Sequence, residues 1–354
     1  MPIVALQIRI HPRTPETVFI RLSNDSISKS KQGSSLYYFT VRFEGMRESV
    51  SQWLAKCAQP VPIVKPYPGW RLGAGEKRSG RLSTELRRQI WHAIKVPVVT
   101  PWLDGLSIYA YPGNETSRAI FVTGNYEPNE FFFLSQVIRP GMTFIDAGAN
   151  MGLYSLFAAQ KVAEHGTVLA IEPSTREGSR LSKNVKINSL ANVRLIRNAV
   201  SDSCSDVELL IADDEWSGHN TLGAFAYDTP LARKEMVQTV SLDDIAVREG
   251  LSRVDIIKMD IEGAELHALR GTAGILERFQ PLLLLELADR ALCHQGSSSS
   301  EVWDFFHQKR YRIFAFDPTT GLLAPARQQP YYDSENVVAV PESCEAAAAW
   351  RSGA

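Results

Sequence analysis

Residues 146–152 read DAGANMG, and this stretch decides the fold of the chain. It follows a short β-type run and opens an apolar helical pattern. A doubly wound α/β fold binds a nucleotide-like ligand at this point, where the first strand ends. Gly148 and Gly152 allow the backbone to approach a ligand closely, and Asp146 and Asn150 supply side chains that can hydrogen-bond to it. The loop therefore predicts a ligand site at the sheet edge.

A second acidic residue, Glu172, closes the next expected strand, about twenty residues beyond the turn, where a carboxylate can accept hydrogen bonds from both ribose hydroxyls of an adenosine. The turn departs from the dinucleotide pattern G-x-G-x-x-G, because Asn150 and Leu153 stand where the second and third glycines belong. A pyrophosphate favours cationic surroundings, whereas this loop carries Asp146 and no Lys or Arg. That charge suits a ligand with an ammonium or sulfonium group. We expect S-adenosylmethionine (SAM), with a nicotinamide or flavin cofactor as the alternative.

The composition is that of an ordinary globular protein. The 354 residues are 44% hydrophobic and 22% charged, with a formal net charge of −1. This balance gives no basic footprint for nucleic acid. The N-terminal residues lack the pattern of a secretory signal, and no run is long enough for a membrane span, so we expect a cytoplasmic protein. The 4 cysteines form no CxxC pair, which argues against a zinc site or a disulfide framework.

The chain divides by its pattern into three parts. Residues 1–105 are less regular and have no assigned role, residues 106–345 form a strongly patterned α/β domain, and residues 346–354 are an alanine-rich tail that we expect to be flexible. A helix is expected over residues 126–136. Strands are expected at residues 107–111, 118–123, 167–171, 193–197, 207–211, 237–240, 254–259, 282–285, 312–316 and 336–340.

Helices are expected between most of these strands. Ser174 with Glu177, and Ser241 with Asp244, match a capping pattern that marks helix starts directly after strand ends. Such alternation predicts a Rossmann-like, doubly wound parallel sheet with right-handed crossovers. A turn at residues 316–321 separates two β-type segments, so the last strand is expected to return antiparallel to its neighbour.

Three blocks of the sequence resemble the FkbM-type SAM-dependent methyltransferases. They are YEPNE (126–130) with FIDAGANMGLYS (144–155), IEPS (171–174) with NAVSD (198–202), and VSLDDI (240–245) with DIIKMDIEGAELHALRG (255–271). The resemblance is clearest over residues 126–290, extends weakly to NVVAVP at 336–341, and does not reach the first hundred residues. The usual family form of the first loop is D-V-G-A-N-x-G, so Ala147 is a mild departure that should not alter binding.

The resemblance implies an enzyme that transfers a methyl group from SAM by in-line displacement, usually to a hydroxyl of a sugar, glycolipid, polyketide or similar metabolite. The expected partner is thus a small-molecule or glycan acceptor. By position, Asp146, Gly148, Asn150 and Gly152 would line the methionine and ribose side, and Glu172 would bind the ribose hydroxyls. Ala199 and Asp202 follow the third strand, where such folds place the adenine. Asp202 has an equal alternative as a loop carboxylate without ligand contact.

The acceptor side is expected at the ends of the next two strands. Asp260 follows the strand at 254–259 and is our candidate for the general base, since a hydroxyl is a poor nucleophile until its proton is being removed. Glu262 either favours the start of the following helix or contacts the acceptor. His219, in SGHNTL at 217–222, is a third catalytic candidate, because this polar segment could fold over the cofactor.

Glu286 ends the strand after that of Asp260, so both carboxylates could reach one mouth. Such a pair could bind Mg²⁺, which prefers oxygen ligands, although we do not expect a metal to be required. Two other functions stay open at the level of the sequence: a nicotinamide-dependent oxidoreductase on the same kind of sheet, and a non-catalytic SAM-binding module. The acceptor and the oligomeric state are not indicated.

Overall fold

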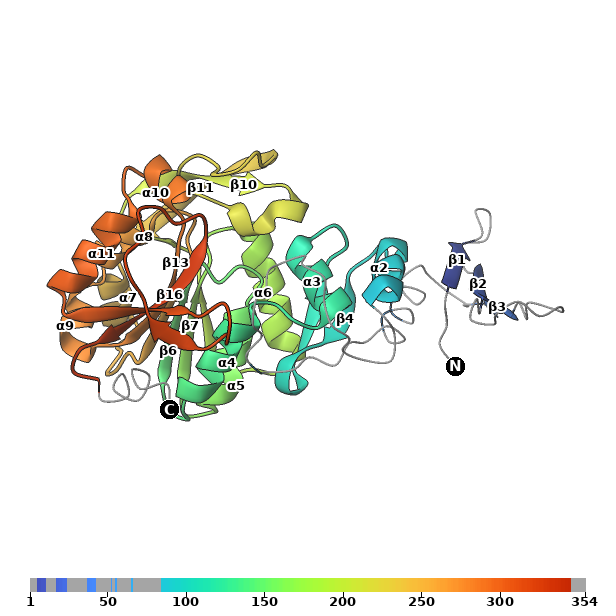
Figure 1. Ribbon diagram of the computed structural model, residues 1–354, viewed down its shortest axis with the longest axis horizontal. Coiled ribbons are helices and arrows are strands. Elements are labelled where there is room, and N and C mark those ends of the chain that lie inside the picture. The colour runs from blue at the N-terminus through green and yellow to red at the C-terminus, as the bar shows by residue number, and fades with distance from the viewer. Residues whose placement is uncertain are drawn as a thin grey trace. The chain divides into compact units, whose positions relative to one another are not determined.

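The computed structural model describes residues 84–344, the backbone of three earlier strands, and residues 52, 55 and 65. The early strands are β1 (Ala5–Ile10), β2 (Thr17–Ser23) and β3 (Tyr37–Arg42), which pair antiparallel in that order (Figure 1). The chain forms two compact units, one of Met1–Ile63 with Leu72–Tyr126 and one of Val64–Arg71 with Glu127–Ala354. The tail expected at residues 346–354 lies outside the described residues.

The first unit contains a helix where a strand was expected. Its described elements are α2 (Thr84–Ala93), β4 (Val98–Pro101), η1 (Leu103–Gly105), β5 (Ser107–Ala110) and α3 (Glu115–Thr123). The prediction of a strand at 118–123 was wrong, because Asn114 caps α3: its side-chain oxygen accepts from the Ser117 N–H at 2.8 Å. The apolar run that looked like a strand is the buried side of this helix.

The second unit is built on an eight-stranded sheet in the order β15-β14-β16-β13-β12-β6-β7-β8. These strands are β6 (Thr143–Ala147), β7 (Thr167–Ile171), β8 (Val193–Ile196), β12 (Ile256–Met259), β13 (Leu282–Leu287), β14 (Tyr311–Phe316), β15 (Leu323–Pro325) and β16 (Glu335–Pro341). The pairs from β8 to β13 are parallel, while β16 runs antiparallel to both β13 and β14. The Rossmann-like fold and the antiparallel last strand are therefore confirmed.

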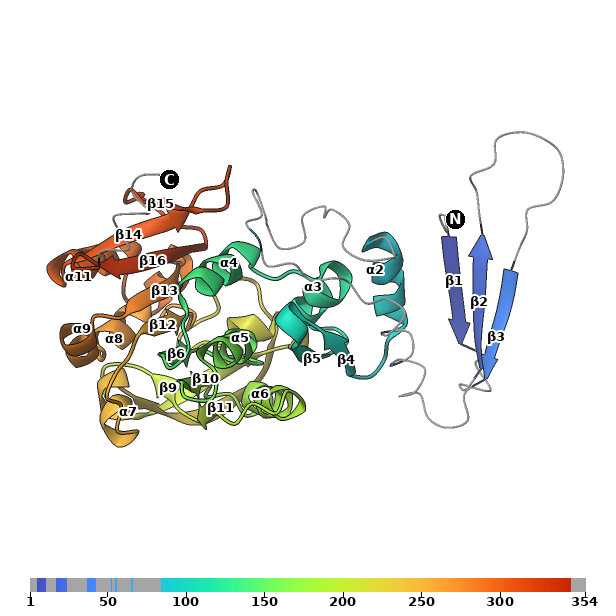
Figure 2. The same cartoon turned by 90° about the horizontal axis from the view of Figure 1, so that it is seen from below.

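Helices cover both faces of this sheet. Figure 2 shows α4 (Pro128–Val137) and α5 (Leu153–Val162) on one face, and α8 (Glu265–Arg270), α9 (Ala273–Phe279) and α11 (Ser299–Gln308) on the other. The remaining helices are α6 (Thr175–Ile187), α7 (Leu242–Arg248) and α10 (Asp289–His294). None of the described helices is long and apolar enough to cross a membrane.

Two helix starts follow the predicted capping pattern. The Ser174 hydroxyl accepts from the Glu177 N–H at 3.4 Å, and the Ser241 hydroxyl accepts from the Asp244 N–H at 3.0 Å. Both caps come directly after strands, so they fix where the chain leaves the sheet. The helix that Ser174 caps begins shortly after Glu172. The cap therefore keeps the Glu172 carboxylate at the sheet edge.

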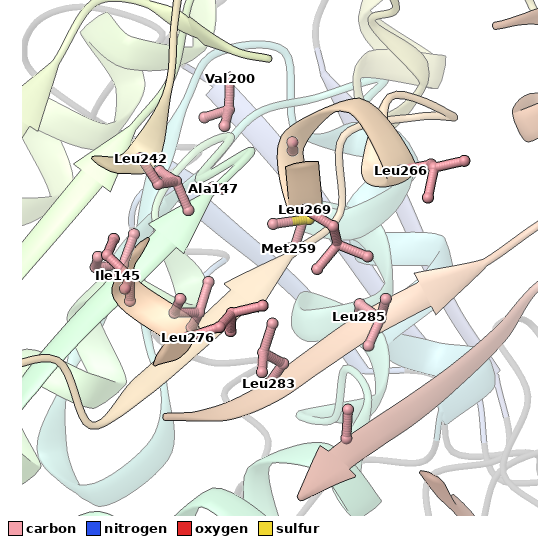
Figure 3. Packing of buried hydrophobic residues seen from close by; sticks show 14 of the residues in the cluster. Ile145, Ala147, Val200, Leu242, Met259, Leu266, Leu269, Leu276, Leu283 and Leu285 are labelled. Atoms are coloured by element: carbon pink, nitrogen blue, oxygen red, sulfur yellow. The ribbon is translucent and has the colours of Figure 1, made fainter. Parts of the chain in front are cut away.

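The main core lies between the sheet and helices α7, α8 and α9. Figure 3 shows Leu276 and Leu269 packed beside Met259 and Leu283, with Ile145 close by. Full burial of each such side chain contributes about 1.5–3 kcal/mol. Because side chains alternate across a strand, Met259 faces this core while the neighbouring Lys258 faces α5 on the other side of the sheet.

A smaller sheet of β9 (Ala199–Val200), β10 (Asp206–Ala212) and β11 (Leu231–Val240) stands beside the main one, in the order β10-β11-β9. β10 and β11 are antiparallel, and the chain between them carries the short helix η2 (Asp214–His219). We call residues 213–230 the η2 loop. This loop matters for function because several of its residues reach the carboxyl edge of the main sheet.

Candidate active site

A cleft opens where β6, β7 and β12 end. Each of these strands is followed by a lining residue: Gly148 after β6, Glu172 after β7 and Asp260 after β12. The η2 loop forms part of the opposite wall. The complete lining is Gly148, Asn150, Ile171, Glu172, Pro173, Asn198, Ala199, Val200, Leu209, Ser217, Gly218, Asn220, Leu222, Asp260, Ile261, Glu262 and Ala264. The structure thus brings six of the sequence-predicted site residues together: Gly148, Asn150, Glu172, Ala199, Asp260 and Glu262.

Gly148 stands where two backbone segments meet. Its φ is +76°, and a Cβ added to it would lie 1.9 Å from the carbonyl oxygen of Asp260. The N–H groups of Gly148 and Ala149 both donate to the Ile171 carbonyl at 3.0 Å. Only glycine fits this position, because any side chain would collide with the backbone after β12. The cofactor turn and the segment carrying the candidate base are therefore in direct contact.

Glu172 is held firmly at the floor of the cleft. It is 5% exposed, and its two carboxylate oxygens accept from the N–H groups of Asn150 and Ser174, each at 2.8 Å. Burial, together with the nearby charge of Glu177, raises the pKa of Glu172 to about 8. Each oxygen has a further lone pair, so a neutral hydroxyl donor such as a ribose can still bind there.

Asn150 connects the cofactor turn to the η2 loop. Its φ of 49° lies in the left-handed region, which Asn tolerates better than most residues. Its side-chain amide donates to the Ser217 carbonyl at 3.2 Å and accepts from the Met151 N–H at 2.7 Å. The turn and the loop therefore enclose the cleft from two sides.

Asp146 and Gly152 lie behind this wall and are not among the lining residues. Asp146 is 1% exposed, accepts from the Ser155 hydroxyl at 2.6 Å, and burial raises its pKa. Gly152 has a φ of +95° at the start of α5, and a Cβ there would meet the Leu181 side chain at 2.9 Å. Both residues shape the turn in the structure, and a direct contact with a cofactor stays a prediction for each.

Ala199 and Asp202 separate at the end of β9. Ala199 is buried in the cleft lining, whereas Asp202 is outside it. The Asp202 carboxylate lies 3.5 Å from the His267 ring nitrogen Nδ1 and accepts from the Ser203 hydroxyl at 3.1 Å. These contacts agree with the structural alternative for Asp202, and its proposed contact with adenine stays untested.

Three carboxylates gather on the acceptor side. One oxygen from each of Asp260, Glu262 and Glu286 lies within 4.8 Å of the others, and we call these residues the carboxylate cluster. Glu286 also accepts from the Ser334 hydroxyl. Burial and the Asp260 charge raise the pKa of Glu286 to about 8, and burial with the Glu286 charge raises that of Glu262 well above its usual range. Such a cluster can hold a cation, or it can relieve repulsion by keeping protons.

Glu262 joins the cluster through an unusual backbone conformation. Its φ is 54°, and the Thr221 hydroxyl of the η2 loop donates to its carbonyl at 2.9 Å. Its side chain does not cap α8, which begins three residues later and has no side-chain cap. Glu265 instead accepts from the N–H groups of Ile261 and Gly263, at 3.0 and 3.3 Å.

Lys258 lies beside the cleft and pairs with a carboxylate, the structural pairing that its position in the sequence favours. It is 5% exposed, and its ammonium donates to Asp260 Oδ2 at 3.1 Å and to the Gly148 carbonyl at 3.3 Å. It lies 4.0 Å from Asp146 Oδ1. Burial lowers the pKa of Lys258, but the Asp260 and Asp146 carboxylates outweigh burial and raise it, so the side chain stays charged.

Lys258 contacts Tyr154, which is part of a network of hydrogen bonds with Glu127 and Asn336. Its ammonium lies 5.0 Å from the centre of the Tyr154 ring, and the Tyr154 hydroxyl donates to Glu127 at 2.6 Å. The Asn336 side chain of β16 donates to the same carboxylate at 3.2 Å. Glu127 belongs to the YEPNE block, so the presence of an acidic residue there was the one sequence signal that could have pointed to this network.

His219 is outside the cleft lining although its neighbours in the η2 loop are inside it. Its Nδ1 lies 3.2 Å from the Thr229 hydroxyl, and its ring centre lies 5.6 Å from Trp216 and 5.2 Å from Tyr227. The structure thus places His219 in an aromatic group on the loop. Contact with a substrate stays a prediction for this residue.

Comparisons with known proteins agree with the sequence resemblance. Residues 146–313 match the family described as the methyltransferase FkbM domain. Methyltransferase sdnD of Sordaria araneosa is 30% identical over 154 residues, covering 36% of this chain and 59% of that protein. The 31-O-demethyl-FK506 methyltransferase FkbM of Streptomyces tacrolimicus is 26% identical over 166 residues, covering 38% of this chain and 60% of that protein.

Among solved structures, the methyltransferase FkbM of Methylobacillus flagellatus KT has 16% identity and a TM-score of 0.39, over 64% of this chain and 54% of that chain. The chain spans about three fifths of the length of the two curated relatives named above. The match with the domain family includes the cofactor turn, Glu172, Asp260 and Glu286. The α/β region of this chain, over residues 146–313, thus matches the FkbM methyltransferase domain family, as the sequence resemblance implied.

Proposed function

We propose that this protein is a SAM-dependent O-methyltransferase acting on a hydroxyl of a small-molecule or glycan acceptor. The observation that carries the proposal is the meeting of Gly148, Glu172 and Asp260 in one cleft at the carboxyl edge of a methyltransferase-type sheet. In open α/β sheets this edge is where ligands bind. The match of residues 146–313 to the FkbM methyltransferase domain family supports the same activity.

The chemistry of the cleft supports SAM. The side chains that line it include the carboxylates of Glu172, Asp260 and Glu262, and no Lys or Arg of the described chain is among them. This donor set suits a cationic sulfonium beside a ribose, and it is unfavourable for a pyrophosphate, which needs cationic or N–H-rich surroundings.

The reaction that we propose needs little covalent chemistry from the protein. When bound, SAM would supply an electrophilic methyl group: the sulfur–carbon bond breaks, and an oxygen–carbon bond forms with the acceptor. Glu172 would hold the ribose, and the turn at Gly148 would fix the distance to the segment after β12. Alignment of this kind corresponds to about 7–11 kcal/mol of the barrier. Asp260 would take the proton that leaves the acceptor hydroxyl.

The proposed oxygen acceptor draws support from one relative. The Streptomyces tacrolimicus protein is named for methylation of a 31-O position. Asp260 as a base fits a hydroxyl, because that acceptor loses a proton during transfer. The cytoplasmic location expected from the sequence stays a prediction.

The test is incubation of the protein with methyl-labelled SAM and an extract of its source organism, followed by identification of the labelled molecule. We expect label on an oxygen of a small molecule or glycan, and label that accumulates at least about 10²-fold more slowly with an Asp260→Asn variant. Asp228, an exposed residue of the η2 loop, provides the matched control, since Asp228→Asn should label normally. Label on nitrogen or carbon would contradict the O-methyl assignment, and absence of any transfer would contradict the activity.

A further inference from the structure

We propose that Lys258 is a positioning residue for methyl transfer, acting by holding the Asp260 carboxylate against the cofactor turn. The inference rests on the proposed function and adds a residue to it. The ammonium of Lys258 bridges Asp260 Oδ2 at 3.1 Å and the Gly148 carbonyl at 3.3 Å. One side chain therefore ties the candidate base to the turn that would hold the methyl donor.

The Asp260 carboxylate depends on this contact. Within the part of the chain that the structure describes, Lys258 is the one hydrogen-bond donor to it. The Asp260 side chain is 31% exposed, so without that contact it is free to rotate toward solvent or toward Glu262 and Glu286. A base must lie within hydrogen-bond reach of the proton that it removes, which makes a fixed rotamer important.

Lys258 itself is fixed on three sides. Its stem leaves β12, where Lys258 is in register with Asp146 of β6, and its ammonium lies over the Tyr154 ring. Tyr154 is held in turn by its hydroxyl bond to Glu127. Only 7% of the Lys258 side chain is exposed, so the surrounding residues restrict it to this conformation. A side chain that only balanced charge would not need such a restricted position.

The cofactor turn does not need Lys258 to keep its shape. The N–H groups of Gly148 and Ala149 bond to Ile171, and that of Asn150 bonds to Glu172. Loss of the Lys258 contact to the Gly148 carbonyl therefore leaves the turn in place. This separates the two effects of a substitution: SAM affinity should survive, while the rate of transfer should fall.

The test is a double-mutant cycle between Lys258→Met and Asp260→Asn, measured with labelled SAM and the acceptor identified from the extract. Lys258→Met should lower kcat by about 10²-fold, the cost of a misplacement of about 1 Å, while KM for SAM stays nearly unchanged. In the Asp260→Asn background, Lys258→Met should change kcat by no more than about twofold, because the group that it positions is already lost. Lys161, whose ammonium lies 5.3 Å from the Phe157 ring centre, provides the control, and Lys161→Met should keep the wild-type kcat.

Two results would overturn the inference: a wild-type kcat for Lys258→Met, or losses that multiply in the double variant. Removal of the buried cation can also prevent folding, which calorimetry with SAM would reveal. In that case Lys258→Arg decides, because it keeps the charge but cannot place a single ammonium between Asp260 and Gly148; a reduced kcat supports the inference and a wild-type kcat contradicts it. If the wild type transfers no methyl group, the proposed function has failed and this inference falls with it.

Discussion

The carbonyl oxygen of Asp260 occupies the space that a Cβ on Gly148 would need, at 1.9 Å from the ideal Cβ position. Two segments 112 positions apart in sequence therefore touch through their backbones, and one of them carries the candidate base while the other forms the cofactor turn. This contact fixes how far the base stands from the turn. It also explains, without reference to a ligand, why a glycine is required at position 148.

Gly148→Ala should destabilise the protein and abolish SAM binding. The positive φ alone costs about 1–2 kcal/mol for a residue with a Cβ, and the collision with Asp260 adds to it. Gly250, at φ +63° with open space around it, provides the control for strain without collision. Urea unfolding should show a clearly larger loss for Gly148→Ala than for Gly250→Ala; equal losses would mean that the contact with Asp260 is not tight.

Glu172→Ala should weaken SAM binding by about 10- to 100-fold, since it removes the acceptor of two ribose hydrogen bonds, each of which contributes about 0.5–1.5 kcal/mol. The substitution also removes the acceptor for the N–H groups of Asn150 and Ser174. Calorimetric titration with SAM measures the change. Glu164→Ala, at a side chain that is 85% exposed, should bind SAM as the wild type does. An unchanged affinity in Glu172→Ala would remove this residue from the ribose site.

The stability of the SAM-free protein should fall as the pH rises from about 5 to 8. Burial raises the pKa of Glu172 and of Glu130 to about 8, so in this range the unfolded chain has lost protons that the folded protein retains. Fewer protons on the unfolded state make the free energy of unfolding decrease with pH, by at most about 1.4 kcal/mol per pH unit for each group.

Glu130→Gln tests the pH effect, because Glu130 is 8% exposed and its amide replacement can still accept from Asn336. Urea unfolding of this variant between pH 5 and 8 should show a shallower decline than the wild type. Glu164→Gln should keep the wild-type slope. A decline as steep in Glu130→Gln as in the wild type would show that Glu130 does not retain its proton in the folded protein.

Local sequence signals predicted much of the fold and part of the site. The cofactor turn and the caps at Ser174 and Ser241 depend on neighbouring residues, so their pattern is visible in the chain. The strand expected at 118–123 failed because its apolar composition fits a buried helix equally well, and the cap at Asn114 decided between the two. Apolar composition alone does not distinguish a short buried helix from a strand.

The rest of the site depends on contacts between distant segments. Lys258 meets Asp146 because β12 and β6 pair in one register, and the sequence does not specify that pairing. Glu262 lies near Glu286 because its own φ is positive, and a positive φ at a glutamate cannot be predicted from the sequence. The places of Asp260 and Glu286 after adjacent strands predict that these two form a pair. From the sequence, Glu262 is a candidate for acceptor contact but is not grouped with that pair, for this reason.

Asp260→Asn should lower kcat by about 10²–10⁴-fold, which is the usual contribution of a positioned base. SAM affinity should stay near that of the wild type, because Asn keeps the volume and the backbone contact with Gly148. The measurement compares single-turnover transfer with calorimetric binding of SAM. A variant with normal turnover would exclude Asp260 as the base, and a variant that no longer binds SAM would assign it to the cofactor instead.

Removal of metal ions should leave methyl transfer nearly unchanged. The carboxylate cluster can relieve its own repulsion, since the raised pKa values of Glu262 and Glu286 keep protons on these side chains near neutral pH. Lys258 supplies a fixed positive charge beside Asp260, which further reduces the need for a cation. The protein is dialysed against EDTA and assayed with and without added Mg²⁺. The two rates should agree within about twofold, whereas a Lewis acid that lowered the barrier by several kcal/mol would change the rate far more. Loss of transfer with EDTA and recovery with Mg²⁺ would instead make Asp260, Glu262 and Glu286 the ligands of a required metal, and Glu286→Gln would then lower the affinity for that ion.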